Sequence, residues 1–400
     1  MTIRNTKGFI LILFILLPVF SWTSTPEETV NPIQANLVAA ASPEVNEGFT
    51  RADGSQPIEF PADHGPHPDY QTEWWYFTGN LNLENGQARN IGSGDTTPDH
   101  FGYQLTFFRR ALIPSTEIMP RESNWATSQI YMAHFALTDV VDSRYNSYER
   151  LSRGAAGLSG AIAQPFSVWL EDWLVEEITQ DTYHLVASQD GISLDLILVD
   201  AKGPILQGDQ GYSQKGPDPG QASYYYSLTH LETTGTIRTV TRTYNVTGTS
   251  WMDHEYSTSA LSPDQIGWDW FSIQLDNDNE LMVFQIRKSD GSVDPFSSGI
   301  YIAQDASTTP LSQEDFSIRI TDYWTSPRTN TEYPAGWELS IPSLKLTLKA
   351  RPLLPDQEFY GSYSYWEGAV QVEGEIDGGP LTGSGYVELT GYTRSMGGEF

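Results

Sequence analysis

Alternation of apolar and polar residues is the main pattern of this chain after about residue 57. Short runs in which every second residue is apolar are separated by Gly, Asn, Asp and Pro. This period of two is typical of antiparallel strands joined by turns. The clearest runs predict strands at residues 73–82, 102–109, 132–139, 182–187, 192–199, 223–231, 236–248, 270–276, 281–288 and 344–350. Helical periodicity is nearly absent, so the sequence predicts an all-β fold.

Two segments add local detail to this picture. Residues 276–279 (DNDN) lie between two strand-like runs and indicate a hairpin connection. The segment lacks the glycine and the distant glutamate of an EF-hand, which disfavours a calcium loop. Residues 167–178 mix large apolar residues with acids in a pattern that fits either an amphipathic helix or strands.

The N-terminal residues predict the compartment. Arg4 and Lys7 precede an apolar run at 9–20, and residues 21–25 supply the small residues that a signal peptidase needs. We therefore expect a signal peptide over residues 1–25 and an exported protein, periplasmic or extracellular, with no stable membrane anchor. Residues 26–56 are poor in aromatics and rich in Pro, Ala, Asn and Glu, which predicts a flexible leader.

Chain length predicts the domain organisation. The part that follows the leader is longer than one hydrophobic core usually supports. We expect two domains, residues 57–247 and residues 248–400, each built as a β-barrel. The chain has no cysteine, so no disulfide framework stabilises them.

Charge narrows the classes of partner. The chain has 51 acidic and 22 basic residues and a formal net charge of −29. Nucleic acids and anionic lipid surfaces repel such a protein. The acids are spread along the chain, as expected for a solvated exterior. A small molecule is therefore the expected partner.

Two central segments concentrate the residues that carry chemistry. Residues 251–256 (WMDHEY) and 267–270 (GWDW) hold Asp253, His254, Glu255 and Asp269 among tryptophan and tyrosine rings. Carboxyl groups that lose water contact beside such rings have raised pKa values, which brings them into the range useful for proton transfer. We interpret the two segments as parts of an apolar pocket with a polar reactive centre.

Strand geometry restricts which side chains can share that pocket. Side chains alternate along a strand, so Asp269 points away from the face that carries Trp268 and Trp270. Any aromatic ring beside Asp269 must then come from another strand, for which the candidates are Trp74, Tyr76 and Trp251.

The same alternation divides the first segment. His254 and Tyr256 share one face, and Asp253 and Glu255 share the other. We expect His254 to face the pocket, because two neighbouring acids in a pocket repel each other, whereas at a rim they are solvated. Asp269 can equally be a buried structural carboxylate, and His254 a hydrogen-bonded histidine between domains.

Other candidates carry less information. His134, in an apolar run, can face a pocket of the first barrel or be a packed core residue. Residues 64–69 (HGPHPD) resemble a metal-ligand segment, but no cysteine and no further histidine cluster completes it. The chain has no Gly-x-Ser-x-Gly elbow, P-loop, dinucleotide fingerprint or His-Glu-x-x-His motif. We therefore expect no metal and no cofactor.

Several longer motifs are similar to the AttH and carotenoid 1,2-hydratase family. Besides the two central segments, they are residues 67–79 (HPDYQTEWWYFTG), 103–109 (YQLTFFR), 133–139 (AHFALTD), 333–337 (YPAGW), 365–368 (YWEG) and 385–392 (GYVELTGY). The resemblance implies two lipocalin-like antiparallel β-barrels in tandem and an apolar pocket. For the characterised branch of the family it implies addition of water to an isolated carbon–carbon double bond of a terpenoid without a cofactor.

The resemblance also implies roles for individual residues. Hydration of such a double bond needs a neutral acid, a surface that stabilises the tertiary cation, and a group that orients water. The family depends on an aspartate in this region, which is matched to Asp269, with His254 as its polar partner. The expected ligand contacts are Trp74, Tyr76, His134, Trp251, Tyr256, Trp268 and Trp270.

Three functions remain open from the sequence. The first is a cofactor-independent hydratase or related lyase acting on an isoprenoid or polyene. The second is a non-catalytic periplasmic carrier of a hydrophobic molecule. The third is a carbohydrate-active protein that uses a carboxylate pair and stacking aromatics. Long apolar walls favour the first two, and an open groove with paired carboxylates favours the third.

Overall fold

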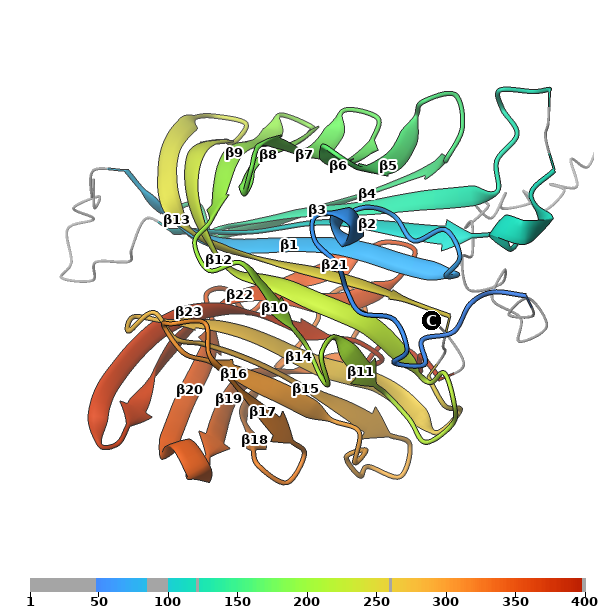
Figure 1. Cartoon of the computed structure of the whole chain (residues 1–400). Helices are drawn as coiled ribbons and strands as arrows, with labels where there is room; N and C mark the ends of the chain where they lie inside the picture. The colour runs from blue at the N-terminus through green and yellow to red at the C-terminus, as the bar shows by residue number, and fades with distance from the viewer. Residues whose placement is uncertain (1–47, 85–99, 120–121, 259–260, 398–400) are drawn as a thin grey trace, which may run out of the picture. The chain divides into compact units, whose positions relative to one another are not determined.

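Strands make up nearly all of the regular structure in the computed structural model, which describes residues 48–84, 100–119, 122–258 and 261–397 (Figure 1). The described part also contains three short 3-10 turns, at Ala62–His64, Ser115–Glu117 and Pro342–Leu344, and no α-helix. The predicted all-β fold is confirmed. The predicted signal peptide and residues 26–47 of the predicted leader lie outside the described residues. In the described residues, no helix has the length and apolarity to span a membrane.

The first sheet is a nearly closed antiparallel barrel (Figure 1). Its strand order is β4-β3-β2-β1-β13-β12-β9-β8-β7-β6-β5, and β10 and β11 add to β12. The strands are β1 (Thr72–Leu83), β2 (His100–Ala111), β3 (Gln129–Asp139), β4 (Arg144–Arg153), β5 (Ser159–Ala163), β6 (Phe166–Leu170), β7 (Trp173–Thr179), β8 (Thr182–Gln189), β9 (Ile192–Asp200), β10 (Pro204–Leu206), β11 (Tyr212–Gln214), β12 (Ala222–Arg238) and β13 (Thr243–Ser257).

The second sheet is a half-barrel. Its order is β17-β16-β15-β14-β23-β22-β20-β19-β18, and β21 adds to β22. The strands are β14 (Gln265–Leu275), β15 (Glu280–Lys288), β16 (Ser298–Ile302), β17 (Thr308–Ser312), β18 (Ser317–Thr325), β19 (Glu332–Ile341), β20 (Leu346–Pro352), β21 (Glu358–Tyr360), β22 (Ser364–Ile376) and β23 (Gly379–Leu389). The two barrel-like sheets match the predicted lipocalin-like architecture.

The strands between the two sheets are buried on both faces. In β9, on the far side of the barrel, Leu194, Leu196 and Leu198 are buried while the residues between them are more exposed. In β1, by contrast, Trp75 and Phe77 join the core inside the barrel, and Tyr76 joins a separate core with Trp270 and Phe284 of the second sheet. The second sheet therefore packs against the outer face of the first barrel, and Figure 1 shows β1, β12 and β13 beside β14, β22 and β23.

Most of the predicted strands lie within strands of the structure. The hairpin predicted at residues 276–279 is confirmed, because β14 ends at Leu275 and β15 begins antiparallel to it at Glu280. The ambiguous segment 167–178 forms strands β6 and β7. The strand predicted at 236–248 is wrong, since it crosses the turn from β12 to β13, where Thr239 donates its backbone N–H to the carbonyl of Arg242. That turn contains neither Gly nor Pro, so the alternation runs through it.

The predicted division at 247/248 lies inside β13. Gly248 occupies a point of close approach, because a Cβ there would lie 2.2 Å from the backbone oxygen of Asn80 on β1. The first sheet continues to Ser257, and the second sheet begins at Gln265. The change of sheet therefore falls between these two residues.

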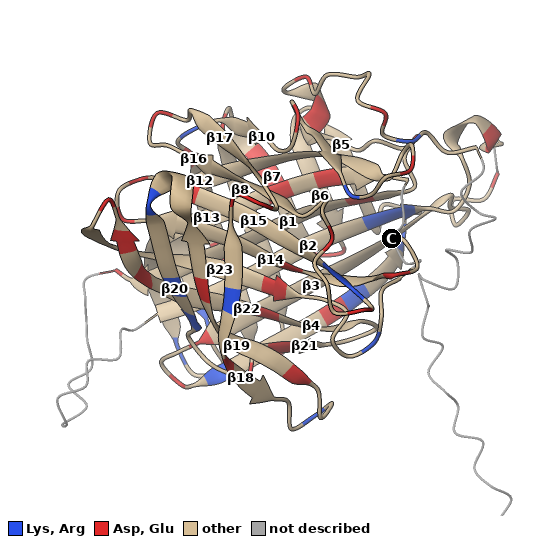
Figure 2. Cartoon of the chain, turned by 90° about the horizontal axis from the view of Figure 1, so that it is seen from below, with Lys and Arg blue, Asp and Glu red and all other residues tan. Residues whose placement is uncertain are grey.

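Acidic residues are spread over many strands and loops of both sheets, as Figure 2 shows for the view from below. This dispersion fits the interpretation of the negative charge as a solvated exterior.

One buried ion pair connects the two sheets. Lys202, in the loop between β9 and β10, donates to Glu280 Oε2 of β15 at 2.6 Å. The Glu280 side chain is fully buried and also contacts His230 of β12, at 3.0 Å from Nδ1. A lysine from the β9–β10 loop and a histidine of β12 therefore hold one carboxylate of the second sheet.

Lys202→Met should destabilise the protein by about 3 kcal/mol, because it removes a partner of a buried carboxylate. The exposed pair Lys345–Asp377 provides the control, since Lys345→Met should leave stability nearly unchanged. Urea unfolding of both variants measures the difference. Equal stabilities would show that the Lys202 pair does not hold the sheets together.

Candidate functional site

A cavity lies between the outer face of the first barrel and the second sheet. Most of its wall is apolar or aromatic, and a few ionisable groups interrupt it. The first sheet contributes Trp74, Tyr76, Phe108, Met132, His134, Tyr225, Asp253 and Glu255, and the second contributes Trp268, Trp270, Phe284, Ile286, Tyr365 and Glu388.

Strand register explains why residues far apart in the sequence meet at this wall. Tyr76 pairs with Asp253 on one side and with Thr106 on the other, and Thr106 pairs with His134. Neighbouring strands lie about 4.8 Å apart, so these residues form one row across four strands. A second row, two residues further along each strand and therefore on the same face, consists of Tyr225, Glu255, Trp74, Phe108 and Met132.

The second sheet presents a matching row. Trp270 pairs with Phe284 on β15 and with Glu388 on β23, and Glu388 pairs with Glu367 on β22. The hydroxyl of Tyr76 donates to Glu367 Oε1 in a short hydrogen bond, which joins the two walls of the cavity. The site thus lies between the outer face of the first barrel and the facing surface of the second sheet, and side chains of both sheets line it.

Asp253 is the acidic group of the first wall. It is buried and accepts hydrogen bonds from Tyr225 Oη at 2.7 Å, Ser227 Oγ at 2.5 Å and Trp251 Nε1 at 2.7 Å. Burial raises the pKa of Asp253 to about 7, against these three donors, which favour the carboxylate. Asp253 can therefore exchange a proton near neutral pH.

The expectation that His254 faces this pocket is wrong. The structure places Asp253 and Glu255 on the cavity wall and His254 inside the barrel. The expected repulsion between the two acids is reduced by Lys215, whose Nζ lies 3.5 Å from Glu255 Oε1, and by the raised pKa of Asp253. Lys215 lies in the loop before β12, so the alternation along the segment 251–256 could not predict its contact with Glu255.

His134 lies on the wall of this cavity between the two sheets, and not in a separate pocket of the first barrel. Its Nδ1 accepts from the hydroxyl of Tyr365 at 2.7 Å, and its Nε2 donates to Glu149 Oε2 at 3.1 Å. Burial lowers the pKa of His134, while Glu149 opposes that effect. This arrangement defines one tautomer of a neutral imidazole.

Alternation correctly put Asp269 on the face of β14 opposite Trp268 and Trp270, but the two tryptophans line this cavity and Asp269 does not. The expectation that Asp269 is the acid inside the pocket is therefore wrong for this cavity. Arg287 Nε donates to Asp269 Oδ1 at 2.9 Å, and the hydroxyl of Tyr392 donates to the same oxygen at 3.1 Å. Burial raises the pKa of Asp269, and the charge of Arg287 opposes this. Asp269 therefore fixes the strand that carries the two tryptophans.

Some of the other residues predicted to contact a ligand line the cavity, and the others lie in the packed core. Trp74, Tyr76, Trp268 and Trp270 line the cavity. Trp251 lies on the same face of β13 as Asp253, in the core between the sheets, and donates to Asp253, and its ring centre lies 6.4 Å from that of Trp270. Tyr256 stacks on His67 at 3.5 Å between ring centres, on the inner side of the barrel.

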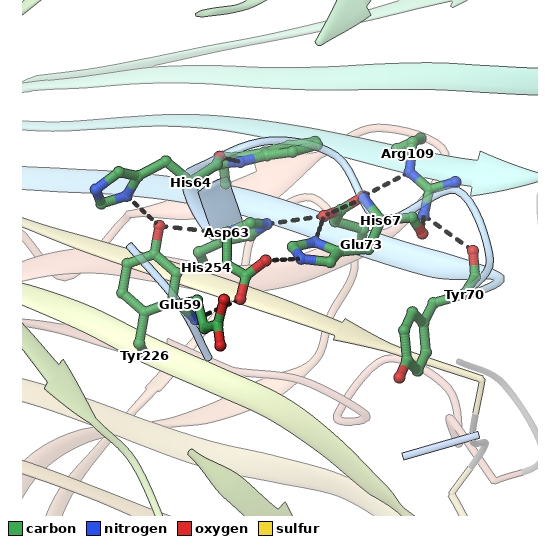
Figure 3. Close-up of polar contacts among 10 residues, drawn as sticks. Glu59, Asp63, His64, His67, Tyr70, Glu73, Arg109, Tyr226 and His254 are labelled. Atoms are coloured by element: carbon green, nitrogen blue, oxygen red, sulfur yellow. Dashed lines mark hydrogen bonds and ion pairs between the residues drawn. The ribbon is translucent and has the colours of Figure 1, made fainter. Parts of the chain in front are cut away.

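Figure 3 shows the second polar cluster, inside the first barrel around Glu73. Glu73 Oε1 accepts from His254 Nε2 at 2.9 Å and from His67 Nδ1 at 2.8 Å, and Glu73 Oε2 accepts from Arg109 Nε at 2.6 Å. Burial opposes ionisation of Glu73, but the charge of Arg109 and the two histidine hydrogen bonds hold its pKa well below the usual range. The cluster connects the segment before β1 to β1, β2 and β13.

Three atoms of this cluster can act as metal ligands, since His67 Nδ1, a Glu73 oxygen and His254 Nε2 lie within 4.8 Å of one another. The hydrogen bonds of this cluster favour protonated histidine nitrogens over a bound metal ion. Both histidine nitrogens already donate to Glu73, and Arg109 adds a positive charge beside it. A metal would have to displace these protons next to a guanidinium.

The comparisons with known proteins cover nearly the whole described chain. The AttH-like family model matches residues 51–392. The chain belongs to the AttH-like family. The crystal structure of an AttH-like protein from Nitrosomonas europaea is similar, with 33% sequence identity, a TM-score of 0.74, and coverage of 86% of this chain and 100% of that one. A search of the curated proteins found no match.

A more distant similarity concerns the fold alone. The crystal structure of kievitone hydratase from Nectria haematococca has a TM-score of 0.61 and 14% identity, over 87% of this chain and 97% of that chain. The AttH-like fold of two barrel-like sheets is therefore shared with an enzyme of very different sequence.

Two glutamates of this AttH-like site escaped the sequence analysis. Glu367 and Glu388 lie on strands β22 and β23, each inside an apolar run, YWEGAV and GYVEL. A charged residue on a strand face that is otherwise apolar was the available signal. Their proximity depends on the pairing of β22 with β23, which the sequence does not specify.

His67→Gln should remove a pH dependence of stability. Burial lowers the pKa of His67, but the hydrogen bonds and charges of Asp63 and Glu73 outweigh it and raise the value to about 9. The resulting stabilisation is complete below the unfolded value of about 6.5 and is lost as pH rises through about 9. The variant should be less stable than the wild type by at most about 3 kcal/mol at about pH 6, and the difference should vanish above pH 9.

Urea unfolding of both proteins across this pH range measures the effect. His184→Gln is the control, because His184 lies on the barrel exterior beside Asp195. A pH-independent difference for His67→Gln would show that His67 does not carry the proton in the folded state.

Asp269→Asn should lower stability by about 3 kcal/mol, because it leaves the Arg287 guanidinium beside a neutral amide in a largely buried pair. Thermal and urea unfolding measure the change. Asp377→Asn, in an exposed pair with Lys345, should change stability by less than about 1 kcal/mol. An Asp269→Asn variant as stable as the wild type would contradict a structural role for this carboxyl group.

Proposed function

We propose that this AttH-like protein binds an isoprenoid or polyene in the cavity between its two sheets and adds water to a carbon–carbon double bond by acid catalysis. The observation that carries the proposal is the composition of the wall, in which indole and phenyl rings surround carboxyl groups with raised pKa values. An apolar cavity with a few oriented polar groups is typical of a small-molecule site.

The wall supplies each group that hydration requires. The faces of Trp74, Trp268 and Trp270 can stabilise a carbocation. Asp253 and Glu388 place carboxyl groups on opposite walls, where one can give a proton to carbon and the other can take a proton from water. This chemistry uses no cofactor.

Asp269 and His254 are proposed as positioning residues. Asp269 holds β14 through Arg287 and so orients Trp268 and Trp270. His254 connects β13 to Glu73 of β1, and its neighbour Asp253 lies on the cavity wall. Neither side chain lies on the wall, so each acts through its neighbours on the strand.

A non-catalytic carrier is the second candidate, because the mostly apolar wall by itself accounts for binding of a lipophile. A carbohydrate site is supported less well. Such a site would need an open groove, whereas the wall of this cavity is mostly apolar and aromatic. We propose export through residues 1–25, a small lipophilic ligand, and no nucleic-acid partner.

Geranylgeraniol, an isoprenoid alcohol with trisubstituted double bonds, is a suitable probe. Its binding should shift the emission of the wall tryptophans to shorter wavelength because it displaces water, and Trp270→Ala should weaken binding at least tenfold because the ring is part of the wall. Incubation in water labelled with a heavy oxygen isotope should yield an alcohol that carries the label, detected by mass spectrometry. Binding without labelled product would favour the carrier, and no binding would contradict the lipophile site.

Asp253→Asn should reduce turnover of geranylgeraniol by a factor of about 100 or more while binding persists. The amide retains the acceptor for Ser227 and Trp251, and its N–H can face the hydroxyl of Tyr225. Asp195→Asn on the exposed face of β9 is the control and should keep full turnover. Unchanged turnover in Asp253→Asn would exclude this residue from the reaction.

A further inference from the structure

Two glutamates face each other directly across strands β22 and β23. Glu367 and Glu388 are cross-strand partners in the antiparallel register, which places their Cβ atoms about 5 Å apart. Glu367 is fully buried, and Glu388 is partly buried at the cavity wall. Two like charges directly opposite each other are unfavourable even on an exposed sheet, and more so in a site with little water.

The surroundings of the pair do not neutralise two charges. The Tyr76 hydroxyl donates to Glu367 Oε1, and Trp268 Nε1 donates to Glu388 Oε1 at 2.5 Å. Glu367 Oε2 has no hydrogen-bond partner in the described part of the chain. Among the described residues, no lysine, arginine or histidine forms an ion pair with either carboxyl group. A proton between the two groups satisfies both observations, because it removes one charge and occupies the unpaired oxygen.

We infer that Glu367 and Glu388 share a proton at neutral pH, and that Glu388 is the acid that protonates the double bond of the substrate. Only Glu388 reaches the cavity wall, next to Trp268 and one strand from Trp270. Glu367, on the neighbouring strand, does not line the cavity. It is a positioning residue that shares the proton with Glu388 and can return it to Glu388. The assignment of the acid rests on the proposed hydration, whereas the shared proton rests on the geometry of the pair alone.

The electrostatics of the pair supports one shared proton. Burial and then the charge of Glu388 raise the pKa of Glu367 well above its usual range. Burial raises the pKa of Glu388 as well, but the hydrogen bonds with Glu367 and Trp268 lower it. The shared proton therefore rests mainly on Glu367 and reaches the substrate through Glu388. The titratable groups that face the pair from the packed elements are Tyr76 of β1, Tyr145 of β4, Glu255 of β13, Tyr365 of β22 and Tyr386 of β23. The same cavity wall also carries His134, Lys215, Asp253 and Arg394.

The proposed step is balanced in atoms and electrons. Glu388 transfers its proton to one alkene carbon, where the π-electron pair forms the new C–H bond and leaves a cation on the more substituted carbon. A water oxygen then donates an electron pair to the cation, and the proton released from that water passes to the carboxylate of Asp253. Exchange with solvent removes this proton and refills the glutamate pair. The net change is the addition of one water molecule.

Infrared spectroscopy tests the shared proton without a substrate. At about pH 7 the Asp253→Asn protein should show the carbonyl stretching band of a neutral carboxyl group, because this background excludes Asp253 itself. The band should be lost or shifted when Glu367→Gln or Glu388→Gln is added. Glu375→Gln, at an exposed position of the same strand, should leave the band unchanged. A band unaffected by either glutamate variant would overturn the shared proton.

Turnover of geranylgeraniol tests the role of acid. Glu388→Gln should reduce turnover by a factor of about 100 or more, while Trp268 can still donate to its amide oxygen and unfolding shows that the fold is kept. Glu367→Gln should keep measurable turnover but move the alkaline limb of the pH profile to lower pH, because the shared proton is gone. Full turnover in Glu388→Gln would overturn the acid role. A wild type that hydrates no isoprenoid but shows the infrared effect would remove the proposed function and leave the shared proton standing.

Discussion

Packing of the second sheet against the outer face of the first barrel is the constraint on which the site depends. It buries both faces of strands such as β1 and β13. Trp75 therefore fills the barrel while Tyr76 meets the second sheet. Polar groups buried between the sheets are stabilised chiefly by partners inside the protein, because burial removes most of their contact with water. The Tyr76–Glu367 hydrogen bond and the three hydrogen bonds to Asp253 meet this requirement.

The polar cluster around Glu73 and the carboxyl groups near the cavity differ in how their buried charge is stabilised. Around Glu73, an arginine and a protonated His67 supply positive charge, so the carboxylate is stabilised and the cluster fixes the start of β1. At the cavity wall the carboxyl groups have hydrogen-bond donors but few cations, so burial raises their pKa values. Charge balance thus separates a structural cluster from one that is able to exchange protons.

Apolar–polar alternation predicted some strands and side-chain orientations correctly and others not. Alternation located strands such as β9 and β15, and it correctly put Asp269 on the opposite face from Trp268 and Trp270. It could not choose between the two faces of β13, because both faces are buried there and both carry polar residues. It also could not see the β12–β13 turn, which has no Gly or Pro. Strand pairing is set by contacts between residues far apart in the sequence, and the apolar–polar alternation within one strand does not specify these contacts.

The sequence by itself determined the all-β character of the chain, its family, and the concentration of aromatic and acidic residues in the two central segments. Only the tertiary structure decided which of these residues act together. Lys215 neutralises Glu255, Arg287 holds Asp269, and Glu367 meets Glu388, and each pair joins residues from different strands or loops. The physical reason is that burial and charge balance, which set the protonation state of a carboxyl group, depend on neighbours that only folding brings together.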